Sequence, residues 1–297
     1  MLWFENRKED NTEDKTKMVV LQNLHTHCSW CDGKDSAEEM ILHALSRGLD
    51  SIGFSAHSPM FYAPEYGMAE ENVERYITEI RTLKEKYRDR IKVFCGLELD
   101  LYSGTDLSPF DYVIGSVHYL KRNGEYVGFD RKLQTVQNVI DTHFDGNGMR
   151  YAKSYYETLA TLPERGKIDI VGHFDLITKH ADSIKFFDED SKVYRSYALE
   201  ALDVLIKKIP LFEINTGAIA RGYRKTPYPS AFLLKEIQKR GGSIVISSDC
   251  HDKNCLLQSF ADAAELALAC GFQETYVKTE QGFSPVSLDE LKKRVMI

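Results

Sequence analysis

The feature that most constrains the fold is a regular alternation of short apolar segments with longer helical patterns. The apolar segments are typical of buried strands and lie at 18–27, 51–57, 91–99, 112–120, 168–176, 210–218 and 243–251. Helical patterns fall between most of them, near 69–89, 151–165, 190–208, 229–240 and 255–270. This order predicts an α/β protein with a parallel sheet wrapped by helices. Because no glycine-rich nucleotide-binding loop follows the first strand, we expect a closed or nearly closed barrel rather than a Rossmann sheet.

Local signals refine this expectation at three places. Ser36 and Glu39 form a possible capping box for a helix that follows the first strand. The third and fourth strand segments follow each other without a proper helix between them, so the barrel should be irregular there. Residues 121–150 are rich in Gly, Asn and Asp and show weak periodicity. They predict a long loop over the strand ends, of a length often found in lids and binding loops.

Composition limits the compartment and the kinds of partner. The net charge of −7 opposes general binding of nucleic acid, which relies on surplus lysine and arginine. No apolar run approaches the roughly 18 residues of a membrane span, and the charged first 17 residues lack the apolar core of a signal peptide. The six scattered cysteines suit reduced cytoplasmic thiols. We therefore expect a charged tail over 1–17, one domain over 18–297 and a cytoplasmic location.

Metal-capable side chains stand at the C-terminal ends of six of the seven predicted strands, where barrel enzymes build their active sites. A lone histidine in a strand is usually a hydrogen-bonded core residue. Burying six histidines and two carboxylates together without a cation would be costly, however. The sequence therefore predicts a metal site formed by His25, His27, His57, Glu98, His118, His173, Asp249 and His251.

Strand geometry narrows the chemistry of this site. Residues i and i+2 share a face of a strand, so His25 and His27 point together, as do Asp249 and His251. Imidazole and carboxylate ligands suit zinc, iron or manganese. A single tetrahedral ion takes four ligands, so this many candidates indicate two or three divalent ions. Glu98 could bridge two of them with its two oxygens.

Several motifs occur in a fixed order between residue 20 and about residue 280. They are HTHCSWCDGK, FSAHSP, CGLELD, IGSVHY, VGHFDL, NTGAIARG with the following YPS, and SSDCH. This ordered set resembles the PHP (polymerase and histidinol phosphatase) superfamily, and its histidinol-phosphatase branch in particular. The resemblance implies a distorted (β/α)7 TIM-like barrel of the PHP type with a trinuclear metal centre.

The resemblance also implies how the ligands divide among three ions. The first ion would take His25, His27, Glu98 and Asp249; the second would share Glu98 and add His118 and His173; the third would use His57 and His251. Many relatives supply a further histidine eight positions after the first of the opening pair, but Gly33 stands there in this chain. Asp32 is the oxygen ligand that could take its place.

The implied reaction is the hydrolysis of a phosphomonoester, in this branch L-histidinol phosphate to L-histidinol and phosphate in histidine biosynthesis. A metal-bridging hydroxide would attack phosphorus. Guanidinium groups match the oxygens of a phosphate, and by resemblance Arg221 is the first phosphate contact and Arg224 the second, although both could be solvated loop residues. Asp130 and His143 are weaker candidates for substrate contacts. The catalytic candidates are Asp249, His251 and Arg221.

Other readings remain open at this point. Another small phosphomonoester could be the substrate. An amidohydrolase-like metallohydrolase also begins with HxH, but it usually ends its barrel in a lone Asp and often carries a lysine on strand four, where this chain has His118. A non-enzymatic metal-binding module or a DNA-processing PHP domain fits less well with an acidic chain that carries no polymerase. Cys28 and Cys31 have CxxC spacing, and we interpret them as small bystanders rather than a redox pair or part of a zinc finger.

Overall fold

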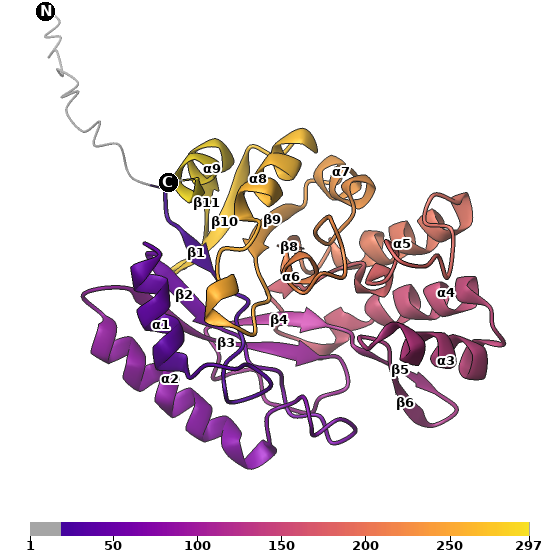
Figure 1. The fold of residues 1–297 in the computed structure, drawn as a ribbon, viewed down its shortest axis with the longest axis horizontal. Helices are drawn as coiled ribbons and strands as arrows, with labels where there is room; N and C mark the ends of the chain where they lie inside the picture. Colours follow the sequence, from indigo (N-terminus) through magenta and orange to yellow (C-terminus); the bar gives the residue numbers. More distant parts are fainter. Residues whose placement is uncertain (1–18, 297) are drawn as a thin grey trace, which may run out of the picture.

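Seven parallel strands form one sheet in the order β1-β2-β3-β4-β7-β8-β9 (Figure 1). This computed structural model describes residues 19–296, so the tail predicted over 1–17 lies outside the described residues. The strands are β1 (Gln22–Asn23), β2 (Ser51–Phe54), β3 (Lys92–Asp100), β4 (Tyr112–Ser116), β7 (Ile170–Val171), β8 (Leu211–Asn215) and β9 (Ser243–Ser247). Six fall inside the predicted segments, and β3 extends one residue beyond its own, which was predicted over 91–99.

The two edges of the sheet meet just beyond the ends of β1 and β9. Thr26 and Cys250 form a parallel bridge, and the backbone N–H of His27 donates to the carbonyl of Cys250 at 2.9 Å. The sheet is therefore nearly closed into a barrel, as predicted. It is distorted because β1 and β7 each contain only two residues.

Helices cover the outside of the barrel where the sequence placed them. They include α1 (Ala37–Ser46), α2 (Val73–Tyr87), α4 (Gly148–Leu159), α5 (Lys192–Leu205), α7 (Ala231–Lys239) and α8 (Phe260–Ala269). The predicted capping box of α1 is present, since Ser36 Oγ accepts from the N–H of Glu39 while the Glu39 carboxylate accepts from the N–H of Ser36 at 2.9 Å. Short helical turns η1 (Glu70–Asn72), η2 (Leu162–Arg165), η3 (Leu176–Thr178), α6 (Gly217–Ala220) and η4 (Lys253–Cys255) lie in the connections.

The prediction of a long loop over 121–150 was wrong. The chain forms a hairpin of β5 (Tyr119–Arg122) and β6 (Glu125–Gly128), then helix α3 (Leu133–Phe144), and α4 begins at Gly148. Two turns account for the loop-like composition: Asn123 and Gly124 turn the hairpin with φ of 51° and 86°, and Asp145 and Gly146 separate α3 from α4 with φ of 55° and 69°. In Figure 1, α3, α4 and α5 lie together at the side of the barrel away from α1 and α2.

The inside of the barrel is filled by the ring of Tyr112. A Cβ atom at Gly96 would lie 2.2 Å from the Cζ atom of Tyr112, and one at Gly53 would lie 2.3 Å from its hydroxyl oxygen. Only glycine leaves room for this ring. The surrounding apolar side chains belong to Leu24, Phe94, Ile114, Ile170, Leu211 and Val245.

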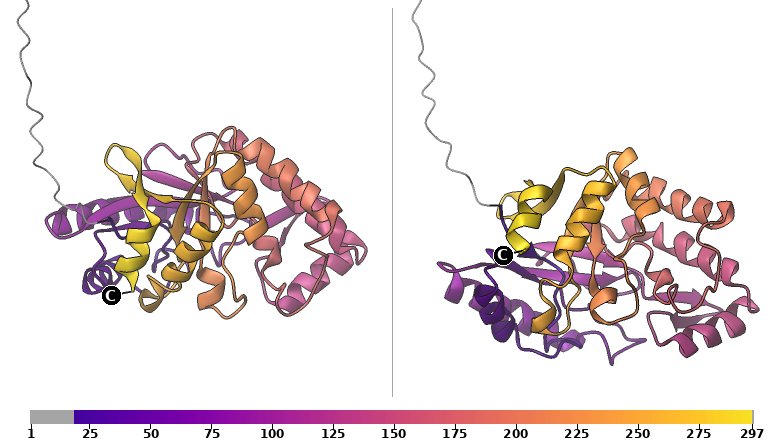
Figure 2. Two further views of the ribbon diagram at one scale, coloured as in Figure 1. Left: turned by 90° about the horizontal axis from the view of Figure 1, so that it is seen from above. Right: turned by 45° about the horizontal axis from the view of Figure 1, so that its top comes forward.

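The last part of the chain adds elements that the sequence analysis did not predict. A hairpin of β10 (Glu274–Thr279) and β11 (Gly282–Ser287) packs Tyr276 and Phe283 against the cluster around Tyr112, and α9 (Leu288–Val295) follows. Figure 2 shows α9 beside the start of the described chain, where Arg294 donates to the carbonyl of Val19. Among residues 19–296, none of the helices combines the length and the apolar character that crossing a membrane requires.

Candidate metal centre

Glu98, near the end of β3, lies at the centre of the predicted ligands. Its Oε2 atom lies 3.2 Å from Nε2 of His25 and 2.8 Å from Nδ1 of His57. Its Oε1 atom lies 2.9 Å from Nε2 of His173 and 3.3 Å from Nε2 of His118. One buried carboxylate thus faces two sets of histidines with its two oxygens, which is the arrangement that a bridging ligand needs.

The first set contains His25, His27 and Asp249, whose ligand atoms lie close enough to share one ion. Nε2 of His27 lies 3.2 Å from Oδ1 of Asp249, and Nε2 of His25 lies 3.6 Å from the same oxygen. Asp249 follows β9 with a φ of 46°, a left-handed conformation that is uncommon outside glycine. Aspartate adopts this conformation more readily than most residues, and its carboxylate here faces the two histidines.

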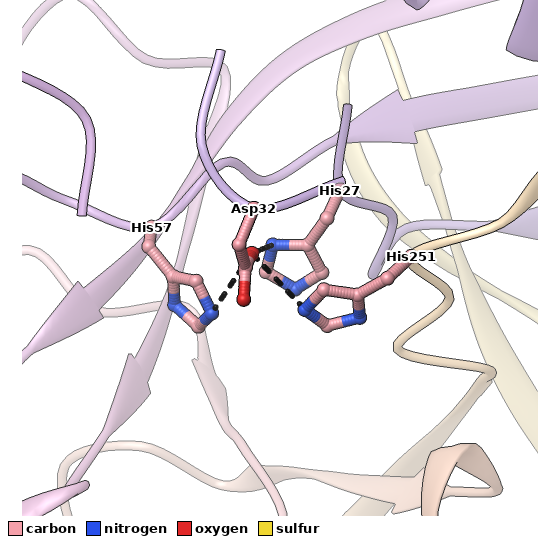
Figure 3. A group of neighbouring side chains, drawn as sticks. All are labelled: His27, Asp32, His57 and His251. Carbon is pink, nitrogen blue, oxygen red and sulfur yellow. Dashed lines mark ion pairs between the residues drawn. The ribbon is translucent and has the colours of Figure 1, made fainter. Parts of the chain in front are cut away.

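A further set of side chains, which shares His27 with the first, surrounds Asp32 (Figure 3). Its Oδ1 atom lies 3.2 Å from Nε2 of His251 and 3.7 Å from Nε2 of His57. Nδ1 of His27 is 4.0 Å away from the same oxygen. The structure therefore brings Asp32 to the place expected for the third ion.

Gly33 explains why the missing histidine cannot stand at its position. A Cβ atom on Gly33 would lie 2.4 Å from the backbone nitrogen of Cys28 and 2.5 Å from the carbonyl carbon of His27. Backbone atoms cannot move aside as a flexible side chain can. The close approach of this turn to the first strand end excludes any side chain at residue 33 and leaves residue 32 to face the site.

The protonation and hydrogen bonding of the cluster suit the binding of cations. Burial, together with His251 and His57, lowers the pKa of His27 to about 3, so its ring is neutral and able to ligate a metal. Burial alone would raise the pKa of Glu98, but the surrounding histidines, His57 foremost, hold it well below its usual value. The buried atoms Nε2 of His25, Nε2 of His27 and Oε2 of Glu98 have no hydrogen-bond partner. Unsatisfied imidazole nitrogens facing an ionised carboxylate fit divalent metal ions.

A second layer of acceptors orients these histidines, and sequence reasoning missed it. Glu213 on β8 accepts from Nδ1 of His25 at 2.5 Å, and Asp100 lies 3.3 Å from Nδ1 of His118. Such partners fix which ring nitrogen faces the metal. The sequence signal was available, because Asp100 lies two residues after Glu98 on the same face, and Glu213 lies on the one strand without a predicted ligand.

A pocket of about 470 Å³ opens over the cluster. Besides predicted ligands, it is lined by Met60, Tyr66, Tyr119, Asp130, Arg131, Lys132, Thr135, Leu176, Lys179, Arg221 and Tyr223. Arg221 donates to Oδ2 of Asp249 at 3.0 Å and to the Asp249 carbonyl at 2.9 Å. Asp130 accepts from Lys179 at 2.6 Å. Two predicted substrate contacts, Arg221 and Asp130, therefore reach the pocket.

Two other predicted substrate contacts do not reach it. Arg224 is buried away from the pocket, where it donates to the carbonyl and hydroxyl of Thr178 and its guanidinium lies 5.0 Å from the ring centre of Tyr228. His143 lies in the last turn of α3 and is not among the pocket residues. The structure therefore gives no support to these two residues as substrate contacts. Lys179, which sequence reasoning passed over, supplies the additional buried cation in the pocket wall.

The cysteines of the CxxC motif have no redox character in this structure. Burial raises the pKa of Cys28 to about 12, and burial with the neighbouring Asp32 raises the pKa of Cys31 well above its usual value. Both thiols are free. A reactive cysteine needs a lowered pKa, so the interpretation of this pair as non-redox residues agrees with the structure.

A seven-stranded barrel with a histidine and carboxylate cluster at its strand ends defines a class of metal-dependent phosphoesterases. The family model described as "PHP domain" matches residues 23–217, and the chain belongs to this family. Within it, the chain is similar to a probable histidinol-phosphatase of Deinococcus radiodurans, with 31% identity over 262 residues, covering 84% of this chain and 93% of the relative.

A second relative and a solved structure are also similar to this chain. The histidinol-phosphatase of Bacillus subtilis is 27% identical over 249 residues, covering 76% of this chain and 92% of the relative. The crystal structure of histidinol phosphate phosphatase from Lactococcus lactis, complexed with zinc, L-histidinol and phosphate, superposes with a TM-score of 0.64 at 21% identity. That alignment covers 90% of this chain and 99% of the other, and it supports the barrel fold.

Proposed function

We propose that this protein hydrolyses L-histidinol phosphate to L-histidinol and phosphate, as a metal-dependent phosphomonoesterase of histidine biosynthesis. The observation that carries the proposal is Glu98, whose two oxygens face two histidine sets beneath a pocket that also contains Arg221. The similarity to histidinol-phosphatases over most of both chains supports the choice of substrate. Histidine biosynthesis is consistent with the cytoplasmic location that we expect for a chain with six free thiols.

Two or three divalent ions, with zinc as the first candidate, would be held by the residues that the structure brings together. His25, His27, Glu98 and Asp249 would hold one ion, Glu98 with His118 and His173 a second, and Asp32, His57 and His251 a third. When bound, such ions acidify water and neutralise charge on phosphoryl oxygens. The chain itself contributes the fixed orientation of its ligands through Glu213 and Asp100.

Arg221 is positioned to bind the phosphate group. Its two bonds to Asp249 fix the guanidinium at the pocket wall and leave other N–H donors for a ligand. A guanidinium fork matches phosphate oxygens in geometry and charge. Lys179 takes the role that we had assigned to Arg224, because its buried ammonium group is held by Asp130 within the same pocket.

The rest of the pocket wall is suited to a small organic group. Met60, Tyr66 and Tyr119 line it with apolar surface that an imidazole ring can pack against. The ring of Tyr66 is fixed because the guanidinium of Arg131 lies 3.7 Å from its centre. These residues, from the segment after β2 and from the hairpin β5–β6, would give the pocket its selectivity among phosphomonoesters.

The test is phosphate release from L-histidinol phosphate and from a panel of other monoesters, including p-nitrophenyl phosphate, by zinc-, iron- and manganese-reconstituted protein. We expect L-histidinol phosphate to be preferred in kcat/KM. Equal rates across the panel would overturn the substrate while leaving the reaction class. Elemental analysis of wild type and of the double variant Asp249→Ala, His251→Ala is the matched control, and equally little metal in both would overturn the metal centre.

A further inference from the structure

Cys31 lies beside one of the predicted metal ligands. A histidine that binds a metal through one ring nitrogen usually donates a hydrogen bond from the other, and this partner fixes the tautomer and the orientation of the ring. His25 has Glu213 as this partner, and His118 has Asp100. For His27, the atom nearest Nδ1 at hydrogen-bond distance is Sγ of Cys31, at 3.4 Å.

The turn that carries Cys31 gives the sulfur a defined direction. The backbone N–H of Cys31 donates to the carbonyl of Cys28 at 3.0 Å, and its thiol lies 3.6 Å from the same carbonyl. With the S–H directed to this carbonyl, a sulfur lone pair faces Nδ1 of His27 and can accept its proton in a hydrogen bond. Trp30 holds the turn against α2, because its Nε1–H donates to Glu79 at 3.0 Å.

The consequence appears at the opposite nitrogen of the same ring. His27 is fully buried, and its Nε2 atom has no hydrogen-bond partner. This nitrogen lies 3.2 Å from Oδ1 of Asp249 and 3.5 Å from Oε2 of Glu98. A proton held on Nδ1 by the sulfur leaves the lone pair of Nε2 directed at the two carboxylates, where the first ion would bind.

Other roles for Cys31 find less support. It is absent from the groups of ligand atoms close enough to share an ion in the described part of the chain. It forms no disulfide with Cys28, which is packed in the hydrophobic core. Asp32 cannot replace it as the partner of His27, because its carboxylate lies 4.0 Å from Nδ1.

We propose that Cys31 is a positioning residue: its thiol holds the proton of His27 on Nδ1 and thereby sets the affinity of the first metal site. The inference rests on the metal centre of the proposed function. It makes one cysteine of the CxxC motif a functional part of the site and leaves Cys28 as a packing residue.

The test uses full-length protein loaded with cobalt(II), compared with the variants Cys31→Ala, Cys31→Ser and, as a matched control from the same turn, Cys28→Ala. Cobalt shifts the Nδ1–H proton signals of its histidine ligands far outside the normal NMR range. We expect Cys31→Ala to lose one slowly exchanging signal and to bind zinc about tenfold more weakly in chelator competition. Cys31→Ser should recover both properties, because a hydroxyl also accepts a hydrogen bond. Cys28→Ala should retain both.

Three outcomes would overturn the proposal. Cys31→Ala could keep every slowly exchanging signal and the full zinc affinity, which would make Cys31 a bystander. Wild type could show a thiolate-to-cobalt charge-transfer band that Cys31→Ala lacks, which would make the sulfur a ligand. A wild type that binds no cobalt would refute the metal centre as well, whereas inactivity on L-histidinol phosphate with intact cobalt signals would refute only the substrate.

Discussion

Replacing Glu213 with glutamine tests whether the second layer of acceptors controls metal binding. The Glu213 carboxylate is 1% exposed, and it accepts hydrogen bonds from His25 Nδ1 at 2.5 Å and from the N–H of His173 at 2.8 Å. Glu213→Gln has nearly the same shape, but it removes a buried negative charge and adds an N–H donor. It should therefore weaken the hold on His25 without opening a cavity.

The expected size of the effect follows from this geometry. Loss of an acceptor that orients a metal-bound histidine costs about 10- to 100-fold in metal affinity, which corresponds to about 1.4–2.8 kcal/mol. The upper half of this range is expected, because the carboxylate is fully buried and its contact with His25 is short and charge-assisted. Water cannot replace the lost acceptor at such a site.

The assay is zinc binding by chelator competition, with thermal unfolding of the metal-free protein measured alongside. Asp100→Asn is the control, because Asp100 orients His118 in the other histidine set, so the two variants should weaken different sites. Zinc affinity within about twofold of wild type for Glu213→Gln, in a protein that folds normally, would refute the assignment of Glu213 as an orienting residue.

Three further predictions concern the loop residues and the pH response. Gly33→His should lower metal content rather than add a ligand, because its Cβ would lie 2.4 Å from the backbone nitrogen of Cys28. Elemental analysis and the melting temperature of the variant would check this. A third tightly bound ion in the variant would contradict it. Arg221→Ala should lower kcat/KM by about 100-fold with little change in stability. Arg224→Ala should instead cost about 1–3 kcal/mol of stability through its lost bonds to Thr178 and keep kcat/KM. The reverse result would exchange the roles of the two arginines. Neighbouring carboxylates raise the pKa of His25 and His118 against the opposing effect of burial, so in the metal-free protein both rings keep their protons beyond pH 6.5. Metal binding must displace these protons, so the affinity for metal should rise with pH until the raised pKa values are passed. Calorimetry in buffers of different ionisation enthalpy should detect the released protons. A metal affinity that does not change with pH would contradict this prediction.

The barrel and the convergence of the predicted ligands could be read from the sequence. Parallel strands joined by helices all end at the same edge of the sheet, so residues such as His57 and His173 had to meet once the alternation was recognised. Alternation within a strand end also paired His25 with His27. The capping box at Ser36 was equally local, because it depends on residues three apart.

The missed elements lie in segments whose composition hid their pattern. Helix α3 buries Val136, Ile140 and Phe144, which recur every four residues as a helix requires, but the Gly, Asn and Asp residues of the turns on either side made the whole segment resemble a loop. The C-terminal hairpin β10–β11 forms because Tyr276 and Phe283 pack against the barrel interior. Sequence pattern was thus present in both elements, and tertiary packing shows where each one is placed.

The sequence by itself determined the fold class, the set of metal-capable side chains and the end of the barrel at which they gather, because strand periodicity is local and the alternation of strands with helices imposes a parallel order. Only the tertiary structure decided how those side chains are used. Arg221 and Arg224 stand three residues apart, yet the turn at Gly222, with φ of 73°, helps direct one to Asp249 and the other to Thr178. Glu213, Lys179 and Cys31 became part of the site only through contacts in space, since a hydrogen bond depends on distance and direction that no spacing along the chain specifies.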